Sequence, residues 1–522
     1  MLLLLFLISL FFRIYGFFQN YPFWVDEFST AKNARYILDY GFDILRNSNI
    51  AFEIRTITAN FLVALFFKIG GQTESMARLP FIIIGSLLPI AVYILAKRLF
   101  NNATAICSSL LTIFSYYLIT WSRQARAYAL LQLLVLITII QYLKIIDAHP
   151  RKNKFGYFFY LLIFFFTIIL GIFTHTIFYI LILSIAVHFA IFKNSELGKF
   201  FNSFLKLFFV SASLLFMLFV PIRLGVFSFF KSSFFGANNL WYYHSFLWRE
   251  YGLISFLAIG GLIIALFEKT KKISLILIYL TFHLIFVAFI WAHYMTKYIL
   301  PIFPLFLIAA SYCIVKLTEL IIEQKAKSRT AWLKRLKVFV PFFITLFIVI
   351  NGDKFTIKPK SYYSLNKHFR EIANIDYQQI YSIIKKKDNL KKVETAIVET
   401  WPDRAKWYLG NGYKNLYYFK WQNEPGRVSG HYKITEFILN KEGEKITGGK
   451  EPLKYIGELS DLKKAMQKHP RGFIFIDDSS LPRDVIDYAE NYLKKELYLD
   501  HYPLDDNPYS IWPATLYSWG IN

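Results

Sequence analysis

The stretch LPFIIIGSLLPIAVYILAK, residues 79–97, contains no charged residue before its final lysine. A helix needs about 20 predominantly apolar residues to cross the hydrocarbon layer of a bilayer, so this stretch is expected to span a membrane. Further apolar runs predict spans at about 1–18, 103–121, 127–146, 156–173, 177–192, 205–224, 252–267, 273–291, 298–320 and 338–352. A shorter run at 57–69 is expected to form a helix in the membrane interface. The predicted fold class is a polytopic α-helical membrane domain of about 11 transmembrane helices.

Hydrophobic residues make up 56% of the 522-residue chain, and they are concentrated before residue 352. This break in composition predicts two domains, a membrane domain at 1–352 and a soluble domain at 353–522. The second domain mixes short buried strands with amphipathic helices, which is typical of a small α/β fold. Its clearest expected elements are strands at Thr395–Glu399 and Gly472–Ile476, and helices at Asp461–Lys468 and Asp484–Leu497.

The formal net charge of +24 would suggest nucleic acid as a partner if the chain were soluble. Lysine and arginine instead gather in alternate loops between the apolar runs, where they set the orientation in the bilayer. These basic loops are expected in the cytoplasm and fall near residues 97–98, 151–154, 193–199, 269–272 and 325–337. The N-terminus would then be cytoplasmic, and both the long first loop, about 19–78, and the C-terminal domain would be extracytoplasmic. The expected partner is the lipid bilayer, and no nucleic acid is expected.

The two cysteines, Cys107 and Cys313, lie inside apolar runs, so neither a disulfide framework nor a cysteine metal site is expected. The N-terminus, Met1–Phe18, lacks a basic start and a small-residue cleavage site. It is interpreted as an uncleaved first membrane helix rather than a signal peptide. The expected location is the plasma membrane, with several crossings.

Two adjacent carboxylates, Asp26 and Glu27, follow the first predicted span at its outer end. Aromatic residues surround them, among them Phe23, Trp24 and Phe28. Carboxylates near apolar walls tend to have raised pKa values and can act as general bases. The alternative is that both are simply solvated at the membrane boundary.

Cationic residues occur in other segments that are expected near the same membrane face. Arg13 lies toward the outer end of the first span, and Arg123 and Arg126 lie in the outer loop Ser122–Tyr128. Positive-inside bias disfavours arginines there, whereas their planar guanidinium groups suit phosphate. The alternatives are snorkelling for Arg13 and pairing of the loop arginines with carboxylates of the first outer loop.

His175 and Lys297 lie in two further loops expected on the outer face. A lone histidine is more often structural, and a lone interfacial lysine often extends its ammonium group into the headgroups. Taken together, however, several outer loops present polar or cationic side chains at one membrane level. This pattern predicts a site that faces outward at the membrane surface and can hold a phosphate.

Five blocks of sequence together resemble a known class of enzymes. They are FFRIYGFFQNYPFWVDEFSTAKNAR (11–35), ESMARLPFIIIGSLLPIAVYILAKRLF (74–100), SRQARAYALL (122–131), THTIFYI (174–180) and KYILPIFPL (297–305). In this order and with this topology they resemble the GT-C class of polytopic glycosyltransferases, in the group of protein O-mannosyltransferases and aminoarabinose transferases. The resemblance covers roughly residues 10–315.

The resemblance implies a fold, a donor and a reaction. A sugar carried on a dolichyl or other polyprenyl phosphate would pass to an acceptor hydroxyl on the outer membrane face, with inversion at the anomeric carbon. The acceptor would be a protein, a lipid or a glycan of the cell envelope.

The resemblance also assigns roles within the first outer loop. Asp26 matches the essential acidic residue of the group, Glu27 its neighbour, and Glu53 a further functional glutamate, so all three are catalytic candidates. Members often have Lys-Pro-Pro or His-Pro-Pro after that glutamate, whereas this chain has Ile-Arg-Thr, with Arg55 as the cation. This departure leaves the acceptor-side geometry and a divalent metal at Glu53 as open questions.

Further site candidates come from the other matching blocks. Lys297 stands where the group usually has arginine before a tyrosine, here Tyr298. Arg78 opens the second predicted span, and Tyr128 closes the loop that carries the two arginines.

The expected chemistry follows from the leaving group. A lipid phosphate is already stable as an anion, so it needs cations rather than a general acid. Asp26 would take the proton of the acceptor hydroxyl, and the donor phosphate would be held by Arg123, Arg126, Lys297 and Arg13. Two interpretations of other classes stay open. One is a transporter or lipid flippase, whose polar residues would lie near the membrane midplane. The other is a non-catalytic scaffold whose outer domain binds a partner.

Overall fold

The structure is a computed structural model that describes residues 1–15, 17, 23–41, 56–147, 154–193, 238–268, 270–291, 294–325, 331–356, 364, 366, 369, 375–388, 394–400, 402–410, 412–419, 427–428, 432–433, 438–439, 445–446, 454–477, 481–500 and 513–521. The predicted span at 205–224 and the candidates Glu53 and Arg55 lie outside these residues.

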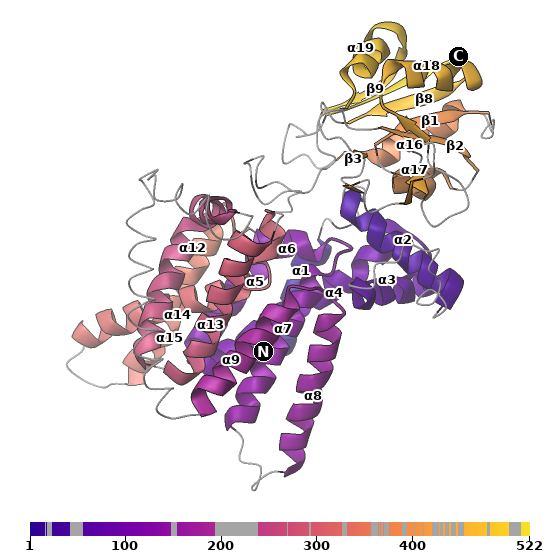
Figure 1. Ribbon diagram of the computed structural model, residues 1–522. Helices are drawn as coiled ribbons and strands as arrows, with labels where there is room; N and C mark the ends of the chain where they lie inside the picture. The colour runs from indigo at the N-terminus through magenta and orange to yellow at the C-terminus, as the bar shows by residue number, and fades with distance from the viewer. Residues whose placement is uncertain are drawn as a thin grey trace.

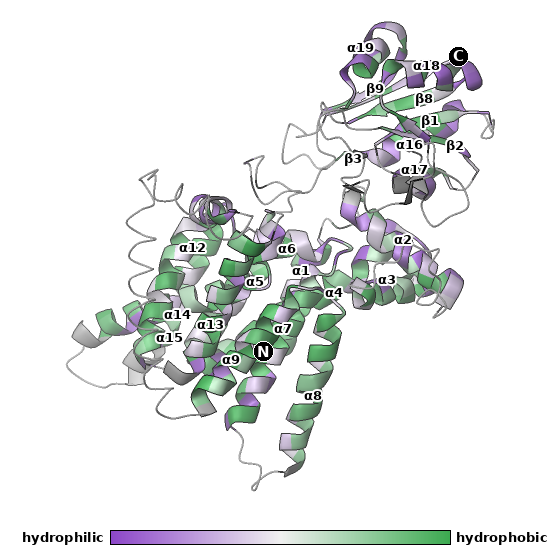
Figure 2. Ribbon diagram, viewed as in Figure 1, coloured by the Kyte–Doolittle hydropathy of each residue, from purple (hydrophilic) through white to green (hydrophobic). Residues whose placement is uncertain are grey.

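The described residues of the N-terminal two thirds of the chain fold into a bundle of helices (Figure 1). The helices are α1 (Leu2–Ile14), α2 (Val25–Tyr40), α3 (Ile57–Gly70), α4 (Glu74–Leu99), α5 (Asn102–Phe114), α6 (Tyr116–Ser122), α7 (Tyr128–Asp147), α8 (Lys154–Ile172), α9 (Phe178–Lys193), α12 (Leu240–Glu268), α13 (Thr270–Ile285), the π-helix η4 (Phe286–Ile290), the 3₁₀ helix η5 (Thr296–Ile299), α14 (Phe303–Lys325) and α15 (Ala331–Asn351). Among the described residues, six helices are long and apolar enough to cross a membrane, and five more are apolar but shorter. Hydrophobic residues dominate these helices in Figure 2, as a lipid environment requires. The polytopic helical class is therefore confirmed, and the total of about 11 spans stays a prediction.

The stretch predicted as one span at 103–121 forms two consecutive helices, because the helix breaks at Ser115. This residue separates α5 from α6 and adopts extended backbone angles, with φ −62° and ψ 112°. Phe355, which follows α15, forms a β-bridge with Ser115, and the Tyr116 N–H donates a hydrogen bond of 3.0 Å to the carbonyl oxygen of Lys354. The segment after α15 therefore satisfies backbone groups that the break exposes.

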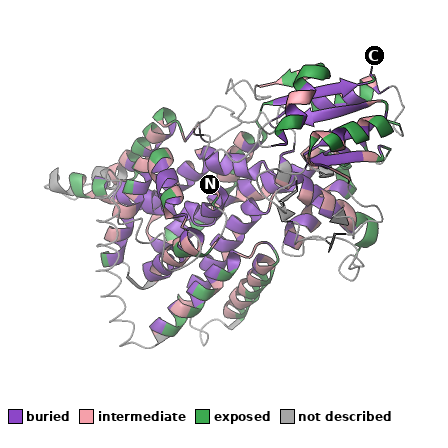
Figure 3. Cartoon of the chain, turned by 45° about the horizontal axis from the view of Figure 1, so that its top comes forward, coloured by how far each residue is buried: buried purple, intermediate pink, exposed green. Residues whose placement is uncertain are grey.

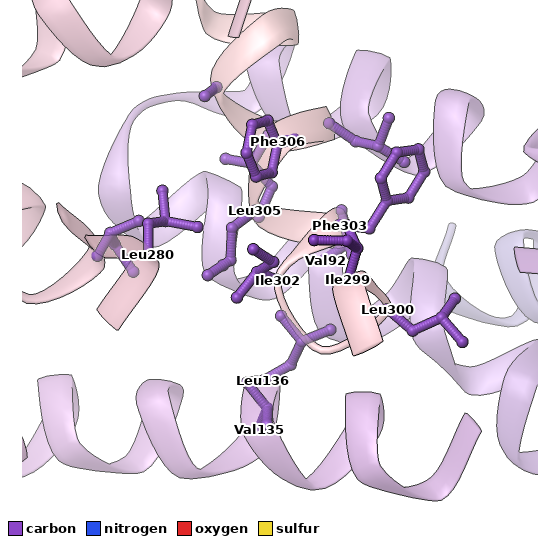
Figure 4. Packing of buried hydrophobic residues seen from close by; sticks show 14 of the residues in the cluster. Val92, Val135, Leu136, Leu280, Ile299, Leu300, Ile302, Phe303, Leu305 and Phe306 are labelled. Carbon is purple, nitrogen blue, oxygen red and sulfur yellow. The ribbon is translucent and has the colours of Figure 1, made fainter. Parts of the chain in front are cut away.

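The bundle is held together by aliphatic and aromatic side chains from several helices (Figure 4). Val92 of α4, Leu136 of α7 and Phe303 of α14 have no solvent exposure. The helices α12 and α14 approach so closely at Gly261 that a Cβ atom there would lie 1.9 Å from the carbonyl oxygen of Ala309. This close packing gives the loops at the end of the bundle a rigid support.

The C-terminal part contains a six-stranded sheet with the strand order β7-β2-β1-β8-β10-β9. Its strands are β1 (Ala396–Glu399), β2 (Asn415–Phe419), β7 (Lys454–Ile456), β8 (Gly472–Ile476), β9 (Lys494–Leu499) and β10 (Ala514–Trp519). β7, β2, β1 and β8 run parallel, whereas β10 is antiparallel to both β8 and β9. Two short hairpins pair β3 (Arg427–Val428) with β4 (Tyr432–Lys433) and β5 (Ile438–Leu439) with β6 (Lys445–Ile446). Both predicted strands are present, and the mixed sheet confirms the predicted α/β class.

Helices cover both faces of this sheet and bury its central strands (Figure 3). They are α16 (Tyr377–Lys387), α17 (Pro402–Leu409), α18 (Leu459–Lys468) and α19 (Arg483–Tyr492). Ile397 and Phe473 point into a core with α16 and α17, whereas Val398 and Ile474 point into a core with α18 and α19. Successive residues of β1 and β8 thus alternate between the two cores, as the pleat of a strand dictates.

The predicted helix at Asp484–Leu497 is wrong in its final part. α19 ends at Tyr492, and residues Lys494–Leu499 form the edge strand β9, which pairs with β10. Lys, Glu and Leu favour helices in isolation. Pairing with the edge of β10 overrides this preference, since the formation of a strand depends more on neighbouring strands than on local propensity.

The sheet-containing part lies at one end of the bundle, against α2 and α3 (Figure 1). The Trp407 ring of α17 lies 5.0 Å from the Phe23 ring and 6.1 Å from the Phe67 ring. The guanidinium of Arg35 on α2 lies over the same indole at 3.9 Å. Tyr408 donates a hydrogen bond to Glu74 at the start of α4. These contacts connect the sheet to the helix that carries the candidate carboxylates.

Candidate active site

Helix α2 presents Asp26 and Glu27 in its first turn. Negative charge is favourable there, because the helix dipole and the unpaired N–H groups give the N-terminus a positive partial charge. Glu27 also accepts a 3.2 Å hydrogen bond from the Trp24 N–H, as in a capping box. The two carboxylates therefore belong to the same helix end, but their side chains lie in different surroundings.

Glu27 is fully buried, and donors occupy both of its carboxylate oxygens. Arg78 of α4 donates to Oε1 at 2.7 Å and to Oε2 at 2.6 Å, and the Ala125 N–H donates to Oε1 at 2.7 Å. Such a bidentate pair with added backbone donors fixes the position of the carboxylate. Glu27 and Arg78 thus join α2, α4 and the loop before α7. This arrangement favours a positioning role for both residues rather than contact with a substrate.

Asp26 instead faces a cavity of about 220 Å³, and its side chain is 27% exposed. Lys297 Nζ lies 2.8 Å from Asp26 Oδ2, and Arg126 Nη2 lies 3.7 Å from the same oxygen. Arg126 also donates to the backbone carbonyl of Asp26 at 3.1 Å and to the Thr30 hydroxyl at 3.2 Å. Pairing with a first-loop carboxylate, the alternative considered for Arg126, is therefore observed. The ion pair lies at the cavity, and both of its residues line the cavity wall.

The Lys297 side chain is 5% exposed, so it does not snorkel into solvent. Its ammonium group lies 5.2 Å from the Trp24 ring, 5.9 Å from the Tyr128 ring and 5.8 Å from the Tyr298 ring. These distances are within about 6 Å, where the face of an aromatic ring attracts a cation. Lys297 is therefore a largely desolvated cation that the aromatic rings hold next to Asp26.

The cavity brings together six of the residues predicted from the sequence. Its lining consists of Asp26, Thr56, Arg126, Tyr128, His175, Thr176, Trp291, Lys297 and Tyr298. Sequence reasoning missed Thr56, Thr176 and Trp291. The sequence positions of two of them could have indicated the site, since Thr176 follows His175 and Trp291 ends a predicted span.

His175 lies between α8 and α9 and is held by its neighbours. Its Nδ1 accepts a 3.2 Å hydrogen bond from the Ile177 N–H, and its ring lies 5.5 Å from the Tyr128 ring. A neutral imidazole that accepts at Nδ1 carries its proton on Nε2. His175 can therefore present a hydrogen-bond donor at this site.

Two of the predicted phosphate ligands, Arg13 and Arg123, do not line this cavity. Arg123 donates to the carbonyl oxygens of Phe12 and Arg13 at 3.0 Å each, and to that of Tyr15. These carbonyls at the C-terminal end of α1 have no partner within the helix, so Arg123 caps it. Arg13 is buried and donates to the Ser9 hydroxyl at 2.6 Å. Their surroundings favour structural roles.

Asp26 and His175 are the lining side chains of types that commonly bind metal ions. A catalytic zinc ion usually takes three protein ligands. In the part of the chain that the structure describes, no group of three His, Cys, Asp or Glu residues could hold a metal. The described residues therefore do not make a metal centre by themselves, and Glu53 lies outside them.

A second cluster of charges lies inside the sheet-containing part. Arg404 Nη1 lies 2.7 Å from Asp477 Oδ2, and Arg404 Nε lies 3.3 Å from Glu399 Oε2. The three side chains are at most 4% exposed, and the Ala405 N–H and the Tyr381 hydroxyl also donate to Glu399. Burial raises the pKa of the Glu399 carboxyl to about 7, although Arg404 acts in the opposite direction. This cluster does not line the Asp26 cavity.

Comparison with known families gives a match over part of the chain. Residues 55–222 match the model of the dolichyl-phosphate-mannose-protein mannosyltransferase family. No curated protein matches the chain significantly.

Solved structures match nearly all of the chain. It is similar to ArnT from Cupriavidus metallidurans in the apo state, with a TM-score of 0.54 and 10% identity over 99% of this chain and 96% of ArnT. ArnT bound to undecaprenyl phosphate gives a TM-score of 0.55 and 11% identity, over 99% of this chain and 97% of ArnT. The oligosaccharyltransferase of Archaeoglobus fulgidus, in complex with Zn and sulfate, gives a TM-score of 0.53 and 12% identity, over 91% of this chain and 67% of that one. The chain therefore has the GT-C membrane fold that its sequence predicts. The family match and the fold together indicate a glycosyltransferase.

Proposed function

We propose that this chain takes a sugar from a polyprenyl-phosphate donor and passes it to an acceptor hydroxyl at the outer membrane face, with inversion at the anomeric carbon. The observation that carries the proposal is the Asp26 cavity, where one carboxylate faces two cations. ArnT, whose fold this chain shares, binds undecaprenyl phosphate. The positive-inside bias of the loops supports an outer location for this end of the bundle.

Lys297 and Arg126 would bind the phosphate of the donor. Lys297 offers a nearly buried point charge, and Arg126 offers a fork of donors at the rim of the cavity. Cations in a site with little water stabilise the negative charge that gathers on the leaving phosphate in the transition state. Because a lipid phosphate leaves as a stable anion, this step needs no general acid.

Asp26 would act as the general base. Its carboxylate pairs with Lys297 and Arg126, and a bound phosphate would compete for both cations. Once they partner the phosphate, the carboxylate is free to accept the proton of the acceptor hydroxyl. The hydroxyl oxygen then bonds to the anomeric carbon, the bond from that carbon to the phosphate oxygen breaks, and polyprenyl phosphate leaves with the electron pair. Attack from the face opposite the leaving group inverts the anomeric carbon.

The transporter alternative predicts a different placement of polar groups. Transporters typically bind their substrates near the membrane midplane, between discontinuous helices. Here Asp26 lies at the start of α2, on the side of the bundle where the sheet-containing part packs. This placement supports a surface reaction on a lipid-linked substrate.

The test is turnover of a panel of radiolabelled polyprenyl-phosphate sugars by the purified full-length chain, with no membrane gradient. We expect one donor to be consumed with release of polyprenyl phosphate, and Asp26→Asn to slow this reaction by about 10²–10⁴-fold, the usual contribution of a positioned base. Asp39→Asn is the matched control, because Asp39 is an exposed carboxylate on the same helix. A chelator added to the wild type measures any dependence on a metal ion.

Wild-type turnover in Asp26→Asn would refute the assigned base. If no donor is consumed, a binding measurement with the same panel separates the explanations. Binding of one donor, weakened in Lys297→Met, would point to a missing acceptor, whereas no binding of any donor would contradict the proposed donor class.

A further inference from the structure

A second cavity, of about 370 Å³, lies at the start of α12. Asn238, Trp241, Tyr242 and Arg249 line it from this helix and the residues just before it. Tyr294 closes it from the segment before η5, and Asn366 and Phe369 contribute from the chain beyond α15. None of these residues lines the Asp26 cavity.

Aromatic rings form the walls of this second cavity. Trp241 is 41% exposed and Tyr294 is 61% exposed. One face of the Trp241 indole stacks on His244, with ring centroids 5.2 Å apart and planes 20° apart. Tyr242 supports Tyr294, with its ring centroid 5.2 Å away. The exposed rings are thus held in place, and they offer fixed apolar surface to a ligand.

Polar groups in the same cavity suit hydroxyls and one acidic group. Asn238 and Asn366 also line the cavity, and an asparagine side chain offers both donors and acceptors. Arg249 is exposed, and no described residue lies close enough to form an ion pair with it. A guanidinium in this setting suits a carboxylate or a phosphate on a ligand. An aromatic belt at the membrane interface would explain the rings alone but not the amides and the arginine around a hollow.

The two cavities share one segment of the chain. Trp291, Lys297 and Tyr298 line the Asp26 cavity, and Tyr294 between them lines the second one. Asn239, the residue before α12, anchors Trp291, since its Nδ2 donates to the Trp291 carbonyl at 2.8 Å. Tyr294, which lines the second cavity, therefore stands three residues before Lys297, the cation that is assigned to the donor phosphate.

We infer that the second cavity binds one sugar ring of a carbohydrate acceptor, and that this ring carries an acidic group. Trp241 and Tyr294 pack on the apolar face of the ring, the two amides bind its hydroxyls, and Arg249 pairs with its carboxylate or phosphate. The term acceptor rests on the proposed function, whereas binding of an acidic sugar does not.

The test is saturation-transfer NMR on the full-length chain in detergent, with three probes: methyl β-glucuronide, glucose 6-phosphate and methyl β-glucoside. We expect transfer to the ring protons of at least one acidic probe, and weaker transfer to the neutral glucoside. Trp241→Ala should abolish it. Arg249→Gln should weaken binding of the acidic probe by about 10-fold or more, as expected for a lost charged hydrogen bond. The two acidic probes distinguish a carboxylate ligand from a phosphate ligand.

Matched controls lie in the sheet-containing part. Tyr492 is 75% exposed and Arg483 is 69% exposed, so Tyr492→Ala and Arg483→Gln remove an exposed ring and an exposed guanidinium away from the cavity. No transfer to any probe, or equal transfer in Trp241→Ala and Tyr492→Ala, would overturn the inference. Equal binding of the acidic and neutral probes in both the wild type and Arg249→Gln would overturn its acidic part. The readout needs no donor, so it can succeed or fail independently of the proposed transfer reaction.

Discussion

The Asp26 cavity and the interior of the sheet-containing part both combine cations with carboxylates, but they enclose them differently. Arg404 lies between Glu399 and Asp477 with all three side chains at most 4% exposed. Asp26 pairs with Lys297 and Arg126 at a cavity, and 27% of its side chain is exposed. The first cluster is sealed from solvent, whereas the second opens to a cavity that an anion can enter. Accessibility, more than the residue types, therefore separates a structural ion cluster from a candidate reactive one.

The largest expected effect comes from breaking the sealed cluster. Arg404→Met would leave Glu399 and Asp477 buried without their cation, and loss of one partner of a buried pair typically costs about 3–5 kcal/mol. We expect β1 and β8 to exchange their amide hydrogens much faster in the full-length variant, as measured by mass spectrometry. Arg483→Met, at an exposed pair, should leave exchange unchanged. Similar exchange in both variants would mean that the sealed cluster does not stabilise the sheet.

Removing the cation of the open cluster should act on turnover instead. Lys297→Met would take away the charge that is proposed to stabilise the leaving phosphate, and loss of one such group typically lowers kcat by about 10²–10³-fold. The unfolding temperature should stay near that of the wild type, because Arg126 still partners Asp26. Lys316→Met, a partly exposed lysine on α14, provides the control. A large drop in unfolding temperature with normal kcat would reverse the distinction between the two clusters.

Arg126 should have a smaller effect, mainly on donor binding. Arg126→Ala removes a charged donor at the rim of the cavity, and charged hydrogen bonds contribute about 1.5–3 kcal/mol. We expect the KM for the lipid donor to rise by about 10-fold or more, with a smaller change in kcat. Arg126→Lys should recover part of the loss, because it restores the charge without the fork of donors. A donor KM that does not change in Arg126→Ala would exclude a phosphate role for this residue.

The smallest expected effect is the pH dependence of the sealed cluster. Burial raises the pKa of Glu399 from an ordinary value of 4.5 to about 7. The folded sheet therefore binds this proton more tightly than the unfolded chain does. Its stabilising contribution is full below pH 4.5 and is lost as the pH rises to about 7. Amide exchange of β1, followed across this interval, should speed up more in the wild type than in Glu399→Gln. Equal slopes would show that Glu399 does not titrate there.

Most of the architecture can be predicted from the sequence, because apolar runs and buried strands are strong local signals. The sequence also points to Asp26, Arg126 and Lys297, which three distant segments bring to one cavity. It does not separate Arg123 from Arg126, because the difference lies in the third dimension. Arg123 meets the free carbonyls at the end of α1, and Arg126 meets the cavity.

Other features could not be predicted from the sequence, because they too depend on tertiary contacts. The strand β9 depends on the edge of β10, and its own residues favour a helix. The pairing of Glu27 with Arg78 joins residues 51 positions apart, so no local pattern reveals it. The second cavity combines Trp241 and Tyr294 with residues beyond α15, and only folding makes them neighbours.

The adjacent carboxylates Asp26 and Glu27 are proposed to have different roles, one chemical and one structural. The measurement that tests this proposal most directly is donor turnover and thermal unfolding of Asp26→Asn and Glu27→Gln, made side by side on the full-length chain. We predict that Asp26→Asn loses turnover but unfolds near the wild-type temperature. Glu27→Gln, which breaks a buried pair with Arg78, should unfold at a clearly lower temperature. Normal turnover in Asp26→Asn, or a Glu27→Gln protein that is fully stable but inactive, would contradict this division of roles.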